Sequence, residues 1–407
     1  MNYSPPHSPL AQTESTYAWM RLGAALLVGT IACVGNWSIV VALPTVQQEF
    51  GVARAGATLP YTFVMIGFGL GGVAMGRIAD RFNTMLPILI GAVSLCLGYV
   101  AAGASQNLWQ FTAAHALLGL GASAGFAPLM ADVSHWFTRR RGLAVVIAAC
   151  GSYLAGAIWP LIIQHFIDTQ GWRWTHVALG LFAAATLAPL SLMFRPAAPH
   201  HTDAPSGAPA AMRGDLKLSP NALMALLVVA GFSCCVAMSM PQVHIVAYCG
   251  DLGYGVARGA EMLSLMLGLG IVSRVASGVV SDRIGGVRTL LIGSVMQGVA
   301  LALYLFFNGL TSLYAISAIF GLFQGGIVPM YAVIIREYLP PREAGVRIGF
   351  VMMATIFGMA FGGYLSGLIF DLTSSYRMAF LNGLAWNMLN LALAAFLMLR
   401  PKMTASA

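Results

Sequence analysis

Long apolar segments separated by short polar ones dominate the chain. Each is long enough to cross roughly 30 Å of hydrocarbon as an α-helix. They lie near residues 22–43, 57–79, 85–104, 108–134, 142–167, 174–194, 221–249, 259–280, 289–308, 311–335, 345–370 and 378–399. The segments are longer than membrane strands and apolar on every face, so they indicate helices and not a membrane β-barrel. We therefore expect an all-α membrane protein with twelve transmembrane helices.

The composition excludes a water-soluble enzyme. Only 8% of the 407 residues are charged, and 58% are hydrophobic. A typical soluble domain has about 25% charged residues. Disordered chains have low hydrophobicity, so disorder is excluded for most of this chain as well. The six cysteines fall within apolar segments, where they fit small buried hydrophobic residues better than a disulfide framework. No metal site and no cofactor are expected.

A polar stretch divides the apolar segments into two sets of six. Residues 195–219 are rich in Pro, Ala and Gly and contain several charged residues, which is typical of a linker. The predicted organisation is a cytoplasmic tail over 1–20, a six-helix bundle over 21–195, a cytoplasmic linker over 196–219, a second bundle over 220–400 and a cytoplasmic tail over 401–407. The N-terminal stretch lacks a basic region before a cleavage site, so no cleavable signal is predicted.

The two sets of segments repeat one another. Three landmarks recur at nearly one offset: Gly76–Arg81 and Gly278–Arg283 (202 residues), Pro128 and Pro329 (201), and Asp168 and Asp371 (203). This duplication predicts two pseudo-symmetric six-helix halves, with a substrate site between them near the membrane midplane.

The basic residues predict an orientation. With the N-terminus in the cytoplasm, 16 of the 21 Lys and Arg residues lie on the cytoplasmic side, four lie outside and Arg274 lies within the membrane. Positive residues concentrate on the cytoplasmic side of membrane proteins, so both termini are predicted to be cytoplasmic. This bias explains the net charge of +8 without a nucleic-acid partner.

Arg274 is the strongest candidate for chemistry. It lies eight residues before Asp282, about 12 Å along a helix from the membrane boundary. Burying an arginine there costs at least roughly 2.5–3.5 kcal/mol, so something must offset the cost. The same helical face offers small and polar residues but no carboxylate. An unpaired guanidinium of this kind suits a substrate carboxylate. The alternative is a structural arginine that bonds to a broken helix end.

The repeated G-x-x-x-D-R loops and the twelve segments resemble the major facilitator superfamily. The resemblance covers nearly all of residues 18–400, although Asn83 stands where a Gly is usual. The fold it implies is the major facilitator fold. The loop motif itself does not indicate a substrate.

Three shorter stretches resemble the monocarboxylate transporter family and its bacterial oxalate/formate-antiporter-like relatives. They are Trp136–Ala144, His244–Tyr254 and Gly270–Arg274. The resemblance implies that Arg274 binds a substrate carboxylate. Dicarboxylate-exchanging relatives carry a second cation in the eleventh segment, but residues 349–369 contain no Lys or Arg. One cation pairs best with one anion, which favours a monocarboxylate.

Two histidines are candidates for proton coupling. His115 lies where many proton-linked superfamily members carry Arg, and a histidine titrates near physiological pH; it is also a candidate substrate ligand. His244 follows Pro241, and proline is common where transporter helices bend. Packing roles are equally compatible with both. Animal-type relatives carry an Asp four residues before the arginine, whereas this chain has Gly270.

Other polar residues complete the predicted site. Aromatic and amide side chains within the segments are candidates for the cavity lining, namely Asn36, Tyr61, Tyr153, Gln324 and Tyr331. Charged residues at the cytoplasmic edge are predicted to form an ion-pair latch that closes when the site faces outward, namely Asp80, Arg81, Asp282, Arg283 and Arg140. The alternative role of these charges is to set the topology alone.

The sequence predicts a secondary active transporter of a small organic anion, above all a monocarboxylate, working by proton symport or anion exchange. The expected partners are this anion, protons and the lipid bilayer, and the expected form is a monomer in a bacterial cytoplasmic (inner) membrane. An exporter of drugs or neutral solutes is the alternative. A membrane enzyme or a transporter-like sensor has less support, because the sequence shows neither a catalytic constellation nor a loop longer than about 25 residues.

Overall fold

The computed structural model describes residues 13–196 and 218–400, which contain helices and no strands. The helices are α1 (Thr16–Ala32), α2 (Val34–Phe50), α3 (Arg54–Arg81), α4 (Met85–Ala104), α5 (Leu108–Ser123), α6 (Ala127–Trp136), α7 (Arg141–Ala149), α8 (Gly151–Gln170), α9 (Trp172–Ser191), η2 (Leu192–Phe194), α10 (Pro220–Asp251), α11 (Val256–Ile284), α12 (Gly286–Phe306), α13 (Leu310–Gln324), α14 (Ile327–Tyr338), α15 (Pro341–Thr373) and α16 (Tyr376–Leu399). The predicted linker lies almost entirely outside these residues, as does the C-terminal tail.

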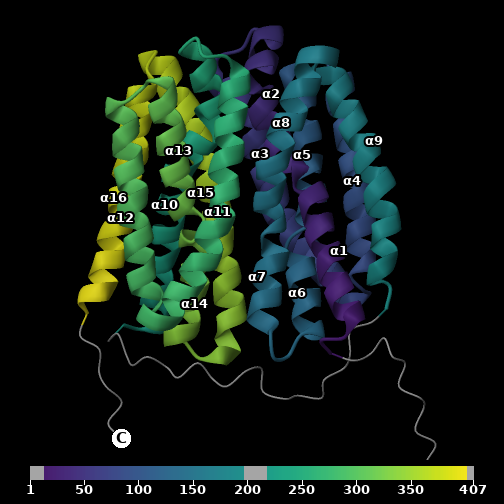
Figure 1. Ribbon diagram of the computed structural model, residues 1–407, viewed down its shortest axis with the longest axis vertical. Helices are drawn as coiled ribbons and strands as arrows, with labels where there is room; N and C mark the ends of the chain where they lie inside the picture. The colour runs from purple at the N-terminus through teal and green to yellow at the C-terminus, as the bar shows by residue number, and fades with distance from the viewer. Residues whose placement is uncertain (1–12, 197–217, 401–407) are drawn as a thin grey trace, which may run out of the picture.

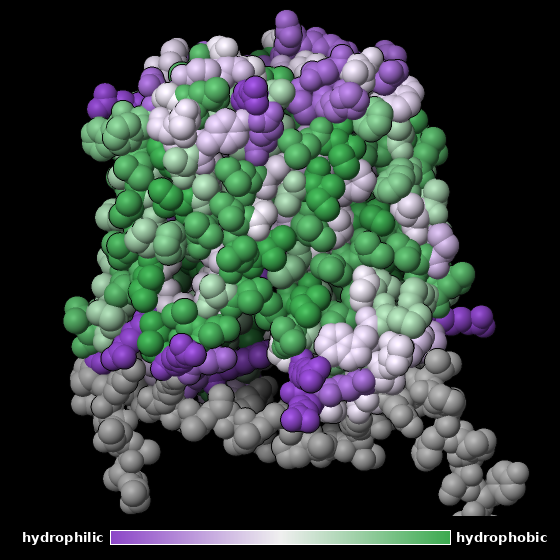
Figure 2. Space-filling model, in the orientation of Figure 1, coloured by the Kyte–Doolittle hydropathy of each residue, from purple (hydrophilic) through white to green (hydrophobic). Residues whose placement is uncertain are grey.

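The described helices form twelve spans long and apolar enough to cross a membrane, which confirms the twelve predicted segments. Figure 2 shows an apolar belt around the visible face, with hydrophilic residues gathered at its upper and lower ends. This distribution fits a chain whose outer surface contacts lipid along the belt and water at the two ends. The fold class is therefore an all-α membrane protein.

The spans stand side by side in two bundles (Figure 1). Helices α1 to α9 form the first half, and α10 to α16 form the second. The end where α2 ends and α3 begins is called the upper end here, and the end where α1 begins is the lower end. Helices α3 and α8 of the first half pack against α15 and α11 of the second, respectively. These four helices form most of the seam between the halves, and α2 also contacts α10 across it.

Four spans consist of two α-helices each, which the sequence pattern did not predict. The breaks fall near Cys33, Cys150, Gly125 and Gly325. At the break between α13 and α14, an added Cβ on Gly325 would lie 2.2 Å from the carbonyl oxygen of Gly270 in α11. Only glycine permits such a close approach of two backbones. A broken helix therefore rests directly on the helix that carries Arg274.

A buried ion pair fastens the lower end of the first half. Both Arg21 and Asp132 have almost no solvent exposure, and their side chains form two parallel hydrogen bonds of 2.8 and 2.7 Å. The Thr84 hydroxyl donates a further bond to Asp132 at 2.9 Å. The Arg21 guanidinium lies 4.8 Å from the Trp136 ring and 4.9 Å from the Phe194 ring. Together these contacts of Arg21 and Asp132 link α1 to α6, to the start of α4 and to η2.

The two halves touch from the upper end to the middle and separate below it. Atoms added at Gly69, Gly363 and Gly367 would lie close to the opposite half, at 3.1 Å in each case. On the lower parts of α3, α11 and α15, added atoms at Gly72, Gly76, Gly278, Gly345 and Gly349 meet nothing within 4 Å among the described residues. The surface is hollowed between the halves at this lower end (Figure 2).

Candidate substrate-binding site

Arg274 projects from α11 into the seam. Its Nη1 donates to the Ala149 carbonyl of the first half at 3.1 Å, and its Nε makes a long contact of 3.4 Å with the Gly325 carbonyl of the second. Both carbonyls lie at helix breaks, which leave carbonyl groups without helical partners. Within residues 13–196 and 218–400, no carboxylate lies within 4.0 Å of this guanidinium. Its hydrogen-bond donors are partly used, but its charge is not neutralised.

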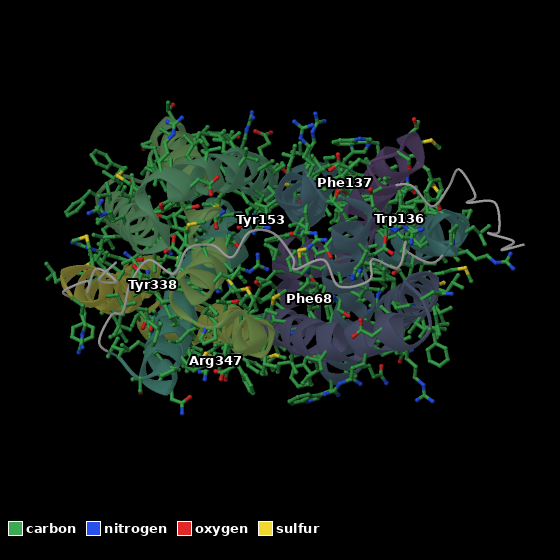
Figure 3. The ribbon with its side chains drawn as sticks, turned by 90° about the horizontal axis from the view of Figure 1, so that it is seen from below. Phe68, Trp136, Phe137, Tyr153, Tyr338 and Arg347 are labelled. Atoms are coloured by element: carbon green, nitrogen blue, oxygen red, sulfur yellow. The ribbon has the colours of Figure 1, made fainter. Side chains whose placement is uncertain are left out.

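Tyr153 holds the guanidinium from the first half. The Arg274 Cζ atom lies 4.4 Å from the centroid of the Tyr153 ring, within cation–π range. Seen from below, Tyr153 lies near the junction of the two halves (Figure 3). A Cβ atom on Gly270 would lie 2.4 Å from Cε1 of this ring. Gly270 therefore leaves the space that lets Tyr153 reach Arg274, and a larger residue such as aspartate would collide with the ring.

A pair of buried glutamines lies beside this contact. Gln242 of α10 donates from Nε2 to Oε1 of Gln324 at 2.6 Å. The Nε2 group of Gln324 is buried with no hydrogen-bond partner in the described structure, and it lies 3.5 Å from the Cβ position of Gly270. An unsatisfied buried donor is costly, so this amide is suited to a bound acceptor. Gln324 was predicted from the sequence, whereas Gln242 was not.

Tyr61 and Asn36 of the first half also carry buried polar atoms that lack hydrogen-bond partners in the described structure. The Tyr61 hydroxyl and the Asn36 Oδ1 atom are buried without partners in the part of the chain that the structure describes. The Tyr61 ring lies 3.1 Å from the Cβ position of Gly363 in the second half. The Tyr153 ring likewise lies against Gly270 of the second half. Tyr61 and Tyr153 thus line one seam.

Two predicted site residues lie inside the bundles. The Tyr331 hydroxyl bonds to the Ala230 carbonyl at 3.1 Å and to Asn390 at 2.8 Å, which places it within the second half. His115 bonds through Nδ1 to the Phe111 carbonyl at 2.8 Å. The His115 ring packs against Phe111 and lies 5.9 Å from the His176 ring of α9, within the first half. No contact joins either residue to Arg274 in the described structure.

His244 lies near the upper closure. Its Nε2 atom is 2.9 Å from the carbonyl oxygen of Gly363 in α15. Its ring centroid is 5.8 Å from that of Tyr376, and its Nδ1 atom is buried without a partner among the described residues. His244 therefore occupies a position between the seam and the contacts that close the upper end.

The upper closure joins the start of α3 to three elements of the second half. The Asp371 carboxylate accepts hydrogen bonds from the backbone N–H groups of Arg54 (2.8 Å) and Ala55 (2.7 Å). The Arg54 side chain is 7% exposed and pairs with Asp251 at 2.9 Å, and it also contacts Tyr376. A carboxylate at a helix N-terminus is favoured by the helix dipole. From the sequence, Asp371 is recognisable only as a repeated landmark, and this closure was not predicted.

The five predicted latch residues lie exposed at the lower end, where the halves are apart. The contacts described for two of them stay within the first half. The Arg140 N–H donates to Glu14 at 2.8 Å, and the Arg81 guanidinium lies 5.6 Å from the Phe82 ring. The latch remains a prediction for a state in which the lower ends approach each other.

Comparisons with known proteins identify the family. The sequence profile of the Major Facilitator Superfamily matches residues 25–312 and 262–407. The chain belongs to the Major Facilitator Superfamily. It is 27% identical to Monocarboxylate transporter 13 of Bos taurus, over 85% of this chain and 86% of that protein. It is 25% identical to the MFS-type transporter pynF of Aspergillus niger, over 89% of this chain and 84% of that one.

The solved structures agree on the fold of this superfamily member. A bacterial homologue of the human lysosomal transporter Spinster, in an inward-facing and occupied conformation, superposes with a TM-score of 0.74. The alignment covers 97% of this chain and all of that one, at 13% identity. The superfamily match and the curated relatives show that the chain is a membrane transporter and not an enzyme. The likeness to monocarboxylate transporters predicted from Trp136–Ala144, His244–Tyr254 and Gly270–Arg274 is confirmed by the match to Monocarboxylate transporter 13.

In this transporter, Gly270→Ala is expected to lower transport about tenfold. The added methyl group would displace the Tyr153 ring, since their atoms would be 2.4 Å apart, and Arg274 would lose its stacking partner, worth on the order of 1–2 kcal/mol. Gly268→Ala is the matched control, because its Cβ position is 3.7 Å from Ala157, an ordinary contact. Initial rates of solute exchange in proteoliposomes compare the two. Equal rates would contradict the role given to Gly270.

Proposed function

We propose that this transporter carries a small organic anion, above all a monocarboxylate, bound at Arg274. The observation that carries the proposal is a guanidinium at the seam with two carbonyl contacts, one from each half, and no carboxylate within ion-pair distance in the described chain. Carbonyl groups satisfy N–H donors without cancelling the positive charge. An anionic substrate supplies the missing charge.

The surrounding groups favour a single planar carboxylate. Contact with the Tyr153 ring helps to hold the guanidinium in place. Its remaining N–H groups can bind two carboxylate oxygens in parallel. The unsatisfied Nε2 donor of Gln324 offers a further hydrogen bond. Binding therefore removes two costs together, an uncompensated charge and an orphaned donor. One cation matches one carboxylate, which favours monocarboxylates over dicarboxylates.

Transport follows from rocking of the two halves about this site. In the orientation predicted from the basic residues, the closed upper end faces outward and the separated lower end faces the cytoplasm, with both termini cytoplasmic. A bound carboxylate neutralises Arg274 and lets the lower ends approach, so that the upper closure opens. Proton symport and anion exchange both satisfy this scheme. A monomer in a bacterial inner membrane is part of the same proposal.

Counterflow into proteoliposomes tests the proposal. Proteoliposomes that contain the purified protein are loaded with lactate, pyruvate, formate, oxalate or an aromatic acid. Entry of a labelled acid into these vesicles is then measured with and without a pH gradient. We expect monocarboxylates to exchange faster than oxalate and far faster than their neutral amides. Acceleration by a pH gradient would indicate proton symport. Exchange of neutral solutes with no response to any acid would contradict the proposal.

The upper closure makes a separate prediction about the conformational equilibrium. Asp371→Ala removes the two backbone bonds between the halves, each charge-assisted and worth roughly 1.5–3 kcal/mol. We expect the population with an open upper end to rise at least tenfold. A cysteine replacing His244, in a background without the native cysteines, reports opening through its rate of labelling by a membrane-impermeant thiol reagent.

The pseudo-symmetric residue Asp168 provides the control. It bonds to Gln164 within its own helix, at 2.8 Å. Asp168→Ala should therefore leave the labelling rate unchanged. If Asp371→Ala and Asp168→Ala altered labelling equally, Asp371 would have no special part in holding the upper end closed.

A further inference from the structure

A cavity lies at the upper end of the second half, next to the residues that hold Arg54 of the first half. Its volume is about 480 Å³, within the range of small-molecule sites. It opens between the ends of α10, α12 and α15 and the start of α16. Six of its thirteen lining residues are aromatic, namely Tyr248, Tyr304, Phe306, Phe307, Phe370 and Tyr376, and its charged residues are Asp251 and Arg377.

Of the two charged side chains that line this cavity, only Asp251 has an ion-pair partner among the described residues. Asp251 already faces Arg54, with its two oxygens 2.9 and 3.2 Å from Nη2. The Arg377 guanidinium has no hydrogen-bond acceptor or ion-pair partner within the residues that the structure describes, and its side chain is exposed. The cavity therefore presents one unneutralised positive charge beside a set of aromatic rings.

Tyr248 adds a free polar group to the same wall. The residue is 9% exposed, and its ring packs edge-on against Tyr376 and Phe380 at centroid distances of 5.0 and 5.6 Å. Neighbouring hydroxyls are engaged, since Tyr304 bonds to Ser317 and Tyr376 to Arg54. The Tyr248 hydroxyl has no partner in the described structure. It is a nine-tenths buried polar side chain that lines the cavity.

We propose that this cavity binds an aromatic carboxylate at the upper end, separate from the transport site. The ring of the ligand lies among the aromatic walls, where offset and edge-to-face contacts are favourable. Its carboxylate pairs with Arg377 and accepts a hydrogen bond from Tyr248. An aliphatic acid lacks the ring contacts, and a neutral aromatic amide lacks the charge.

An occupant of this cavity stabilises the closed upper end. Asp251, Phe370 and Tyr376 line the cavity and also hold Arg54 of the first half, by ion pairing, ring stacking at 4.8 Å and hydrogen bonding. A ligand that fixes these three side chains favours the state in which Arg54 is held. The ligand therefore acts as an inhibitor that slows transport without occupying the Arg274 site.

Thermal unfolding of the full-length purified protein tests binding without a transport assay. The protein carries Arg274→Gln throughout, so that the seam guanidinium is absent. Benzoate at ten times its half-saturating concentration is expected to raise the melting midpoint by roughly 2–4 °C. Acetate and benzamide at the same concentration are expected to raise it by less than half as much.

Variants of the cavity assign the site. Arg377→Gln should abolish the benzoate shift, and Tyr248→Phe should raise the half-saturating concentration several-fold. Arg258→Gln is the matched control and should keep the shift, since Arg258 is exposed near the same end, pairs with Glu261 and does not line the cavity. A shift that survives Arg377→Gln, or an equal shift with benzamide, would overturn the proposal. Failure of the transport proposal would appear separately, as undiminished transport by Arg274 variants.

Discussion

Arg274→Ala is expected to reduce exchange of the transported acid by about 100-fold or more while the protein still folds. The substitution removes a charge-assisted, two-pronged hydrogen bond, for which a loss of roughly 3 kcal/mol is typical, and 1.4 kcal/mol corresponds to a factor of ten. Arg274→Lys is expected to fail nearly as badly. A lysine keeps the charge but loses the planar fork and the stacking on Tyr153.

Counterflow rates in proteoliposomes measure this effect, with size-exclusion profiles in detergent as the check on folding. Arg258→Ala is the control, because this exposed arginine pairs with Glu261 three residues away and lies near the opposite end of α11 from Arg274. Its transport should stay within twofold of the parent. Undiminished transport by both Arg274 variants would contradict the proposal that Arg274 binds the substrate carboxylate.

The number of spans could be predicted from sequence because hydrocarbon thickness imposes a simple rule on length and polarity. The positions of the helix breaks could not be predicted from the sequence. Residues around Cys150 and Gly325 are as apolar as their neighbours, and the break at Gly325 depends on close packing against Gly270 of another helix. These breaks shape the candidate site, since they supply the carbonyl groups that contact Arg274.

A candidate site could be predicted where one residue stood out chemically. Arg274 stood out because burying an ionisable residue in an apolar segment has a large free-energy cost. His115 and Tyr331 illustrate the limit. Their segments are apolar on every face, so the sequence does not indicate which face meets the seam, and both side chains lie within single bundles.

The upper closure shows a second limit. Asp371 and the backbone of Arg54 are separated by 317 positions in the chain. Each residue alone is an ordinary charge at a helix end, which the sequence analysis assigned to topology or to the repeat. Only the packing of α3 against α15 brings the two together. Contacts between halves therefore had to come from the structure, although the halves themselves were evident from the repeat.

Asp132→Asn is expected to destabilise the protein by roughly 3–5 kcal/mol, the cost typical of removing one partner from a buried ion pair. The change keeps the shape of the side chain but leaves Arg21, which is 1% exposed, with an uncompensated charge. Unfolding in detergent, followed by tryptophan fluorescence, should show a midpoint well below that of the parent. Glu343→Gln is the control, since Glu343 pairs with Arg347 on the surface and such pairs contribute at most about 1 kcal/mol.

A double variant separates charge compensation from packing. Arg21→Met with Asp132→Leu removes both charges and keeps apolar volume between the Trp136 and Phe194 rings. Replacing a buried pair by hydrophobic residues is often neutral or stabilising, so this variant should recover most of the stability that Asp132→Asn loses. If the double variant were as unstable as the single one, the hydrogen bonds to Thr84 and to the Met193 carbonyl would be the important contribution. The pair would then stabilise the first half by linking four elements, and its charges would matter only as donors and acceptors.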